Sequence, residues 1–369
     1  MLMLREPTPA NIAQATPSSS ERHSIEVILF GCGHGDTILV RLPVDKWVLI
    51  DCRLTKHDRT YDRFIEFVEA RGITRFEFIF QTHPDYDHFQ GMTDLLMYFT
   101  GGGRSIGYWC DGGINAPQVR DIAWKELISK SRYEALQECL DRLSEKKLIK
   151  FRRIDDDTCH ISPKGFPNIR LIPIAPTASE FRAVTRSDSA KAMVHTEAQL
   201  ETNALSIVLV LSVSGSESSF NVLLCGDAEP AALKAGITRW TDYANQNSLL
   251  VDFEVVKVSH HGSPLSHVDE LCTMGANHNS VALISAGSRK GLPHAKVLRC
   301  WLQHYWRVFI TTTRRATQKY NRPMDLLNRA PAQISCETHD IHAQWSIPGG
   351  FVCTPESASV LIEHVHAYA

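Results

Sequence analysis

A short segment, His83-Pro-Asp-Tyr-Asp-His88, gathers two imidazoles and two carboxylates at closely spaced positions. These are the ligand types that zinc and related divalent ions take in hydrolytic sites, where at least one coordination position stays open to water. One tight turn can direct four such side chains toward one or two ions, but it cannot fill two coordination shells. Taken alone, such a segment is more often a solvated turn, so further ligands must come from elsewhere in the chain.

Two other places in the chain carry ligands of the same kind. Asp227 follows the apolar run Phe220–Cys225, and His260 and His261 follow the run Phe253–Val258. Each has an ordinary interpretation, because Gly-Asp is a common turn and adjacent histidines can decorate a surface. All three sets follow predicted strands, and open α/β sheets bind ligands at the carboxyl ends of their strands. Their combination predicts a metal site.

The strands that would position these residues follow from the apolar pattern. Alternating phenylalanines at 76, 78 and 80 form a strand that leads directly into Thr82 and His83. Short β-rich runs separated by tight Gly or Pro-Asp turns predict a meander at the start of a sheet. The predicted strands cover 25–30, 37–42, 46–51, 76–81, 206–212, 220–225, 253–258, 281–285 and 308–312.

Helices are predicted where apolar residues recur at helical spacing. Tyr61, Phe64, Ile65 and Val68 form one such face, and Gly72 follows as a stop signal. Residues 117–147 have a charged composition typical of helices. Thr354-Pro355 provides a cap and a first-turn proline for a final helix. The remaining helices are predicted around 229–236 and 296–305.

Composition gives the setting for this site. A chain of 369 residues with 43% hydrophobic residues and a net charge of −2 suits one large globular α/β domain or two smaller ones, and it does not demand a polyanionic partner. The ten cysteines include no Cys-x-x-Cys pair, which favours buried free thiols in a reducing compartment over a disulfide framework or a thiolate zinc site. No apolar run is long enough to cross a membrane. We therefore expect a cytoplasmic protein that does not engage membranes, with a disordered lead-in over residues 1–24.

Six motifs occur in a specific order: Gly33-His-Gly-Asp36, Leu49-Ile-Asp-Cys52, Thr82–His88, Asn203 with Ser206, Leu224-Cys-Gly-Asp227 and Lys257-Val-Ser-His-His-Gly-Ser263. In this order they resemble the metallo-β-lactamase superfamily. The nearest branch is the soluble hydrolase (nuclease) domain of ComEC-type competence proteins and their stand-alone relatives, over about residues 25–300. The resemblance implies an α/β (α+β) fold, a four-layer αβ/βα sandwich with two mixed β-sheets. We expect one such domain over 25–369, with a helical insertion around 117–150 and a C-terminal extension from about 313.

The resemblance also implies a ligand set for one or two divalent ions, zinc or manganese. The expected ligands are His83 and Asp85 at a first site, Asp87 and His88 at a second, Asp227 between them, and His260, or alternatively His261, to complete the second. The third histidine of the first site has no evident counterpart, because only His160 and His195 occur between residues 88 and 227. His34 is not counted as a ligand, because relatives often carry glutamine there.

Other residues are expected to support the site. Asp36 and Asp51 lie in turns at strand ends, where carboxylates commonly orient ligating histidines, although they could simply shape the turns. Asp87 is expected to orient the attacking water as well as to bind metal. Phosphate contacts are expected from Lys257, Ser263 and Ser266, and a proton for the leaving oxygen from His294. The alternatives are serines that cap a helix after the loop and a lysine that snorkels from a strand.

The predicted function is therefore a metal-dependent hydrolase, most readily a phosphodiesterase or nuclease. Its substrate would be a phosphodiester such as a nucleotide or nucleic acid, and the segment 314–322, with four cations and one tyrosine, could grip a nucleic-acid backbone or be a solvated basic loop. The alternatives are a hydrolase of a non-phosphate ester or lactam, and a non-catalytic or regulatory protein that acts with a protein partner.

Overall fold

A computed structural model describes most of the chain between residues 24 and 346. The described residues are 24–30, 34–43, 45–57, 59–111, 130–154, 160–177, 179–181, 202–214, 219–275, 280–285, 292–305, 307–311, 334–337 and 341–346. The predicted lead-in, the basic segment 314–322 and the final helix after Thr354 lie outside these residues, apart from Ser24.

The first sheet has seven described strands and is mixed. In spatial order they are β14 (Ile341–Ser346), β1 (Ser24–Leu29), β2 (Ile38–Leu42), β3 (Lys46–Ile50), β4 (Arg75–Gln81), β5 (Ser105–Asp111) and β6 (Lys150–Arg153). Strands β14 to β3 pair antiparallel, whereas β3 to β6 pair parallel. The carboxyl ends of β3 and β4 therefore lie at the same edge.

The second sheet also has seven described strands and is mixed. In spatial order they are β13 (Ile334–Glu337), β12 (Arg307–Thr311), β11 (Val281–Ser285), β10 (Val255–Lys257), β9 (Ser219–Leu224), β8 (Val208–Ser214) and β7 (Ile169–Ala175). Strands β9 to β13 pair parallel, and β7 to β9 pair antiparallel. The carboxyl ends of β9, β10 and β11 thus share one edge.

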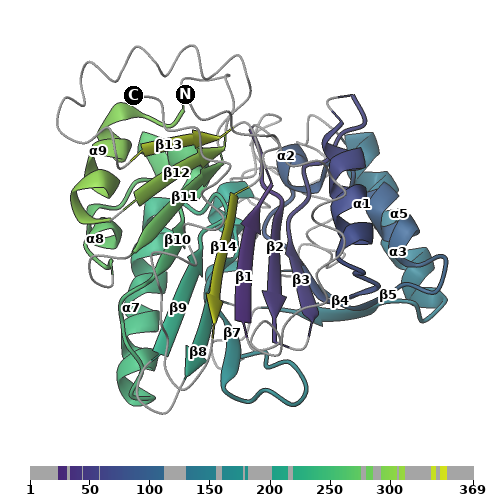
Figure 1. The fold of residues 1–369 in the computed structure, drawn as a ribbon, viewed down its shortest axis with the longest axis horizontal. Helices are drawn as coiled ribbons and strands as arrows, with labels where there is room; N and C mark the ends of the chain where they lie inside the picture. Colours follow the sequence, from purple (N-terminus) through teal and green to yellow (C-terminus); the bar gives the residue numbers. More distant parts are fainter. Residues whose placement is uncertain are drawn as a thin grey trace, which may run out of the picture.

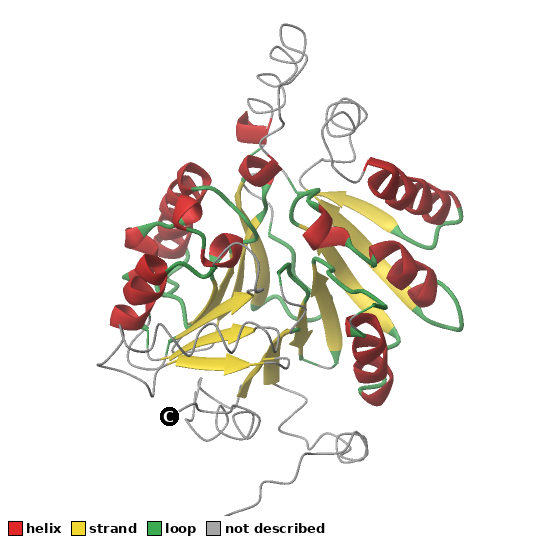
Figure 2. Cartoon of the chain, turned by 90° about the horizontal axis from the view of Figure 1, so that it is seen from above, coloured by secondary structure: helices red, strands yellow, loops and turns green. Residues whose placement is uncertain are grey.

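The two sheets lie face to face between layers of helices (Figure 1, Figure 2). Helices α1 (Thr60–Ala70), α3 (Met92–Phe99) and α5 (Lys130–Glu145) cover the first sheet. Helices α7 (Pro230–Gln246), α8 (Asp269–Cys272) and α9 (Ala295–His304) cover the second. Short turns of helix lie near the strand ends: α2 (Tyr86–Phe89), η3 (Thr202–Leu205), η4 (Ser259–Gly262) and η5 (Pro264–Ser266).

Three hydrophobic clusters fill the spaces between these four layers. One joins α1, α3 and α5 to the first sheet, one lies between the sheets, and one joins α7, α8 and α9 to the second sheet. Burial of apolar surface on both faces of each sheet explains why many strands are continuous apolar runs rather than alternating ones. The predicted four-layer sandwich with two mixed sheets is confirmed.

Strand β4 departs from simple alternation at Glu77. The pairing with β3 shifts register there, which marks a β-bulge. Phe76 consequently faces the helices, in contact with Phe99, whereas Phe78 and Phe80 face the second sheet. In a regular strand these alternate residues would share one face. The bulge thus lets β4 contribute large side chains to two core layers before it reaches the site.

Several predicted elements differ in length from the observed ones. Helix α7 extends well past the predicted end at 236, because Trp240 and Ala244 continue its buried face. Strand β10 is shorter than the predicted 253–258, since Phe253 forms only an isolated bridge with Gly275. The segment after residue 313 supplies β13 and β14, which complete one edge of each sheet. None of the helices in the described part of the chain is long and apolar enough to cross a membrane.

Glu254 directly precedes β10, and its buried carboxyl group should make the stability of the protein depend on pH. Burial raises the pKa of Glu254 from its usual 4.5 to about 8, although its carboxylate accepts a hydrogen bond from the Asn221 backbone N–H (2.6 Å). The folded protein therefore binds more protons here than the unfolded chain between these pH values. Stability is retained below pH 4.5 and falls as the pH rises toward 8, by up to about 1.4 kcal/mol per pH unit.

Urea unfolding of Glu254→Gln beside the wild type between pH 5 and 8.5 measures this effect. The glutamine keeps an acceptor for the Asn221 N–H but cannot ionise, so the variant should gain stability relative to the wild type as the pH rises. The exposed Asp242, changed to Asn, serves as the matched control. A constant difference between wild type and Glu254→Gln across this range would contradict the prediction.

Candidate metal centre

Side chains of metal-ligand type meet where strands of both sheets end. His83 follows β4, Asp227 follows β9, and His261 follows β10, while Asp87 and His88 lie on α2. His34 lies between β1 and β2. The parallel pairing of β3 with β4 and of β9 with β10 explains the convergence, because parallel strands end at a common edge.

A first group consists of His83, His88 and Asp227, all buried, with one potential ligand atom from each within 4.8 Å of the others. His88 Nε2 lies 3.4 Å from Asp227 Oδ1. The rings of His83 and His88 are 4.1 Å apart. Two imidazoles and one carboxylate at this spacing match a three-ligand zinc site of the catalytic kind.

The buried carboxylate of Asp51 orients both imidazoles of the first group. It accepts hydrogen bonds from His88 Nδ1 (2.7 Å), the Thr82 backbone N–H (2.7 Å) and the Thr82 hydroxyl (2.6 Å). Because the Thr82 proton points to Asp51, its oxygen can accept from His83 Nδ1 at 3.0 Å. The Nδ1 atom of each ring therefore donates away from the centre, and Nε2 is directed inward.

A second group consists of His34, Asp87 and His261. Asp87 Oδ2 lies 3.5 Å from His34 Nε2 and 3.5 Å from His261 Nε2. His261 Nδ1 contacts the backbone oxygen (3.0 Å) and hydroxyl (2.9 Å) of Ser285, which again directs Nε2 inward. Asp227 Oδ2 lies 3.5 Å from His261 Nε2, so the two oxygens of Asp227 face different groups.

The structure groups the predicted ligands differently from the resemblance. His88 lies with His83 instead of Asp87, and His261 instead of His260 lies with Asp87. Asp85 Oδ2 is 3.7 Å from His83 Nε2, at the margin of the first group.

His260, the first choice over His261, is turned toward a different partner. Its Nε2 is 3.9 Å from Asp227 Oδ2, whereas its Nδ1 pairs with the Ser266 hydroxyl at 3.0 Å. His260 therefore borders the centre but lies farther from Asp227 than His261 does.

His34 lies in the group around Asp87, although the resemblance does not count it among the ligands. The loop that carries it is held against α2, where the Asp36 N–H donates to the Asp87 carbonyl at 3.2 Å. Gly35 makes this approach feasible: its φ is +123°, and an added Cβ would lie only 2.5 Å from the Asp87 carbonyl oxygen. In the sequence, the glycine between His34 and Asp36 is the one sign that this loop approaches another segment closely.

A buried ion pair between Lys257 and Asp36 lies next to the second group and is connected to it through Ser285. Lys257 Nζ lies 2.6 Å from Asp36 Oδ2 and donates to the Val258 carbonyl at 3.0 Å. The Ser285 hydroxyl donates to the other oxygen of Asp36 and so connects it to His261. Burial alone would raise the pKa of Asp36, but the Lys257 charge and the nearby histidines lower it overall. Lys257 is thus committed to Asp36 and has no exposed surface to offer a substrate phosphate.

The remaining predicted residues lie around the loop after β10. The Ser263 hydroxyl caps η5 by accepting from the Leu265 N–H (3.2 Å), and Ser266 pairs with His260. Both serines are buried and engaged in local bonds. The exposed His294 caps α9, and its backbone N–H donates to the Gly262 carbonyl (3.0 Å), which fixes it beside this loop.

The donor set fits a divalent cation. Within the described ranges, the buried atoms without a hydrogen-bond partner include His83 Nε2, His88 Nε2, His261 Nε2 and Asp227 Oδ1. Burial alone would raise the pKa of Asp227, but His261 and His88 lower it well below its usual range. Burial alone would lower the pKa of His88, but Asp227 and Asp51 raise it well above its usual value. The imidazoles thus balance the buried carboxylate charge by holding protons, a role that a bound divalent cation could take over.

The Asp36–Lys257 pair gives a double-mutant prediction. Lys257→Met leaves the Asp36 charge buried and unpaired, so it should destabilise the protein by about 3–5 kcal/mol. Asp36→Asn combined with Lys257→Met removes both charges and should be more stable than Lys257→Met alone. Urea unfolding of the wild type, both single variants and the double variant measures the coupling. Strictly additive effects would contradict a direct ion pair.

No protein-family model and no curated protein sequence matches this chain. Solved structures that match it include a diphosphatase from the PhnP family, at 12% identity over 86% of this chain and 97% of that chain, with a TM-score of 0.39. A long form of RNase Z from yeast matches at 12% identity over 81% of this chain and 38% of that chain, with a TM-score of 0.37. The metallo-β-lactamase GOB-18 from Elizabethkingia meningoseptica matches at 12% identity over 82% and 94%, with a TM-score of 0.32. At this level of identity the likeness concerns the fold alone.

Proposed function

We propose that the protein is a metal-dependent hydrolase that cleaves phosphodiesters at the centre between the two sheets, as a phosphodiesterase or nuclease. The observation that carries the proposal is the set of four buried ligand atoms without hydrogen-bond partners, from His83, His88, His261 and Asp227. Buried polar atoms of this kind cost free energy unless something pairs with them. One divalent cation in each group of side chains would pair with these atoms.

Each group of side chains would hold one ion. His83, His88 and Asp227 would hold the first, and His34, Asp87 and His261 the second, with Asp227 shared between them. Nitrogen and oxygen donors of this mixture suit zinc or manganese. When bound, such ions act as Lewis acids and lower the pKa of water from about 16 toward 7.

The chain's own residues define the direction from which substrate and water arrive. His83, His88 and His261 are fully buried, whereas the Asp87 side chain is 29% exposed. Burial alone would raise the pKa of Asp87, but its close contact with His261 and the charge of His88 lower it overall. Asp87 is therefore ionised, and it can accept a hydrogen bond from the attacking water and orient it at the open side of the centre.

His294 is suited to the second proton transfer. Its Nδ1 accepts from the Lys296 backbone N–H (3.3 Å), which leaves the proton of a neutral ring on Nε2. The ring is exposed, and its backbone is bonded to Gly262 in the loop that bears His260 and His261. It could donate to the oxygen of a leaving alcohol, as a phosphodiester cleavage requires. The preference for a phosphodiester over an ester or lactam rests on the motif resemblance.

The first test of this function is Asp87→Ala. Protein purified without chelators and supplied with zinc or manganese should hydrolyse bis-p-nitrophenyl phosphate. Loss of Asp87 should lower the turnover by at least about a hundredfold, the lower end of what a positioned acid–base group contributes. Treatment of the wild type with a chelator should abolish the activity, and added metal should restore it.

The matched control is Asp94→Ala, at an exposed acidic residue of α3 that pairs with Lys56. It should retain wild-type turnover. Equal rates for Asp87→Ala and the wild type would refute the mechanism. A wild-type protein that binds no metal would instead favour the non-catalytic alternative. A panel of single-stranded DNA, RNA, cyclic nucleotides and a lactam would identify the substrate class.

The second test concerns His34 as a ligand. His34→Ala should weaken binding of one of two ions and lower the turnover by about 10–100-fold at limiting metal, with recovery at excess metal. Titration with manganese while hydrolysis is followed measures both effects. His57→Ala, at an exposed histidine of the same half of the chain, should leave the titration unchanged. An unaltered metal dependence in His34→Ala would remove His34 from the ligand set.

A further inference from the structure

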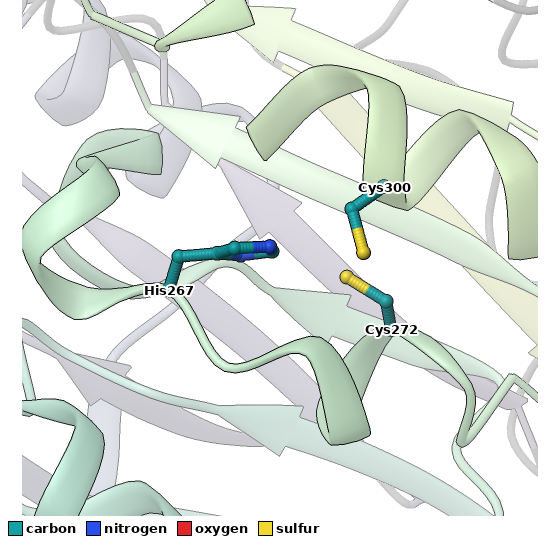
Figure 3. A group of neighbouring side chains, drawn as sticks. All are labelled: His267, Cys272 and Cys300. Atoms are coloured by element: carbon teal, nitrogen blue, oxygen red, sulfur yellow. The ribbon is translucent and has the colours of Figure 1, made fainter. Parts of the chain in front are cut away.

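A second cluster of metal-binding residue types lies on the outer side of the second sheet. His267, Cys272 and Cys300 place one nitrogen and two sulfur atoms within 4.8 Å of one another. Figure 3 shows the imidazole and both thiols directed toward one point between α8 and α9. None of these residues belongs to the candidate catalytic centre.

Three separate pieces of chain bring the cluster together. His267 lies between η5 and α8, Cys272 ends α8, and Cys300 lies within α9. Asp269, the first residue of α8, adds a carboxylate: its Oδ1 is 2.9 Å from His267 Nε2 and 3.9 Å from Cys300 Sγ. Two thiols, one imidazole and one carboxylate are thus available at one place.

We propose that His267, Cys272 and Cys300 bind a structural zinc ion, with Asp269 as the fourth ligand. Tetrahedral zinc with sulfur at about 2.3 Å and nitrogen or oxygen at about 2.0–2.1 Å requires ligand atoms roughly 3.3–3.8 Å apart. The three atoms are already within 4.8 Å of one another, so side-chain adjustments of about 1 Å suffice. Soft thiolates with imidazole select zinc over magnesium or calcium.

The surroundings of the cluster suit this ion. His267 Nε2 is buried and makes no well-aligned hydrogen bond, although Asp269 is close to it. Burial lowers the pKa of His267, so the ring is neutral and can coordinate a cation. Burial raises the pKa of both Cys272 and Cys300, so zinc would displace two thiol protons into solvent as it binds. Two thiolates and one carboxylate around Zn²⁺ leave one net negative charge, and the Lys296 ammonium acts on His267 and Cys300 from nearby.

The ion would stabilise the short helix α8 and its contact with α9. Helix α8 has only four residues, far fewer than an isolated helix needs for stability in water. A metal clip would fix α8 to α9 and hold the chain that enters it. The residue before His267 is Ser266, whose hydroxyl pairs with His260 Nδ1 at 3.0 Å. The clip would therefore also anchor the loop that carries His260 and His261.

Cobalt substitution tests the site separately from catalysis. Co²⁺ bound to thiolates gives a ligand-to-metal charge-transfer absorption in the near ultraviolet, whereas the described ligands of the catalytic centre are only nitrogen and oxygen donors. Wild-type protein reduced with a phosphine and loaded with Co²⁺ should show this absorption. Cys272→Ser and Cys300→Ser should each weaken it by about half or more, and the double variant should lose it and bind one equivalent of zinc less than the wild type. Cys139→Ser, at a buried cysteine of α5, should keep both properties.

The proposal fails if reduced, cobalt-loaded wild type lacks the absorption, or if Cys272→Ser combined with Cys300→Ser retains it. A Cys272–Cys300 disulfide in freshly reduced and re-isolated protein, with zinc content equal to that of the double variant, would overturn it as well. The wild-type spectrum decides the question even if a variant folds poorly. Asp87→Ala should keep the absorption, so an error in the proposed catalytic function would not be mistaken for an error here.

Discussion

The buried carboxylate of Asp51 is the point on which the candidate centre depends. A carboxylate is stable in the interior only when its oxygens are fully bonded, and Asp51 meets this requirement with three short hydrogen bonds. Those bonds join the ends of β3 and β4 to α2. They fix His88 directly and His83 through Thr82. Asp36 performs the corresponding task in the other half of the site, because it holds Lys257 and, through Ser285, orients His261.

The same site contains a concentration of unusual backbone conformations. Asp51, His260 and His261 have φ values of 55°, 48° and 56°, in the left-handed region that residues with a Cβ seldom adopt. Each costs of order 1–3 kcal/mol and persists only where surrounding contacts determine it. For His260 those contacts are its N–H to the Gly226 carbonyl (3.1 Å) and its carbonyl to the Ser263 N–H (2.9 Å). At His261 this backbone conformation accompanies an imidazole whose Nε2 lies 3.5 Å from Asp227 Oδ2, so the strain coincides with the candidate site.

Sequence reasoning predicted the elements and the residue types, because apolar periodicity determines where strands end and polar residues follow. It could not predict the grouping of ligands. His88 and Asp87 are neighbours in sequence, yet on α2 the His88 side chain lies against His83 and the Asp87 side chain against His261. His34 was not counted as a ligand because relatives often carry glutamine there, and only the packing of Gly35 against Asp87 shows where it lies. Cys272 and Cys300 are distant in sequence, so the absence of a Cys-x-x-Cys pair concealed a cluster that helix packing creates.

The location of the centre gives metal binding a structural consequence. His83 and His88 follow strands of the first sheet, whereas Asp227 and His261 follow strands of the second, and the apolar cluster between the sheets sets their separation. Each of the two groups draws ligands from both sheets, so a cation bound in either group would cross-link the two halves of the sandwich and favour the folded state by mass action. The separation of the two sheets then determines both how well the inter-sheet core packs and how tightly the centre binds a cation. A substitution in the inter-sheet core that leaves every ligand in place should still weaken the site, because the second half of the ligand set moves with the second sheet.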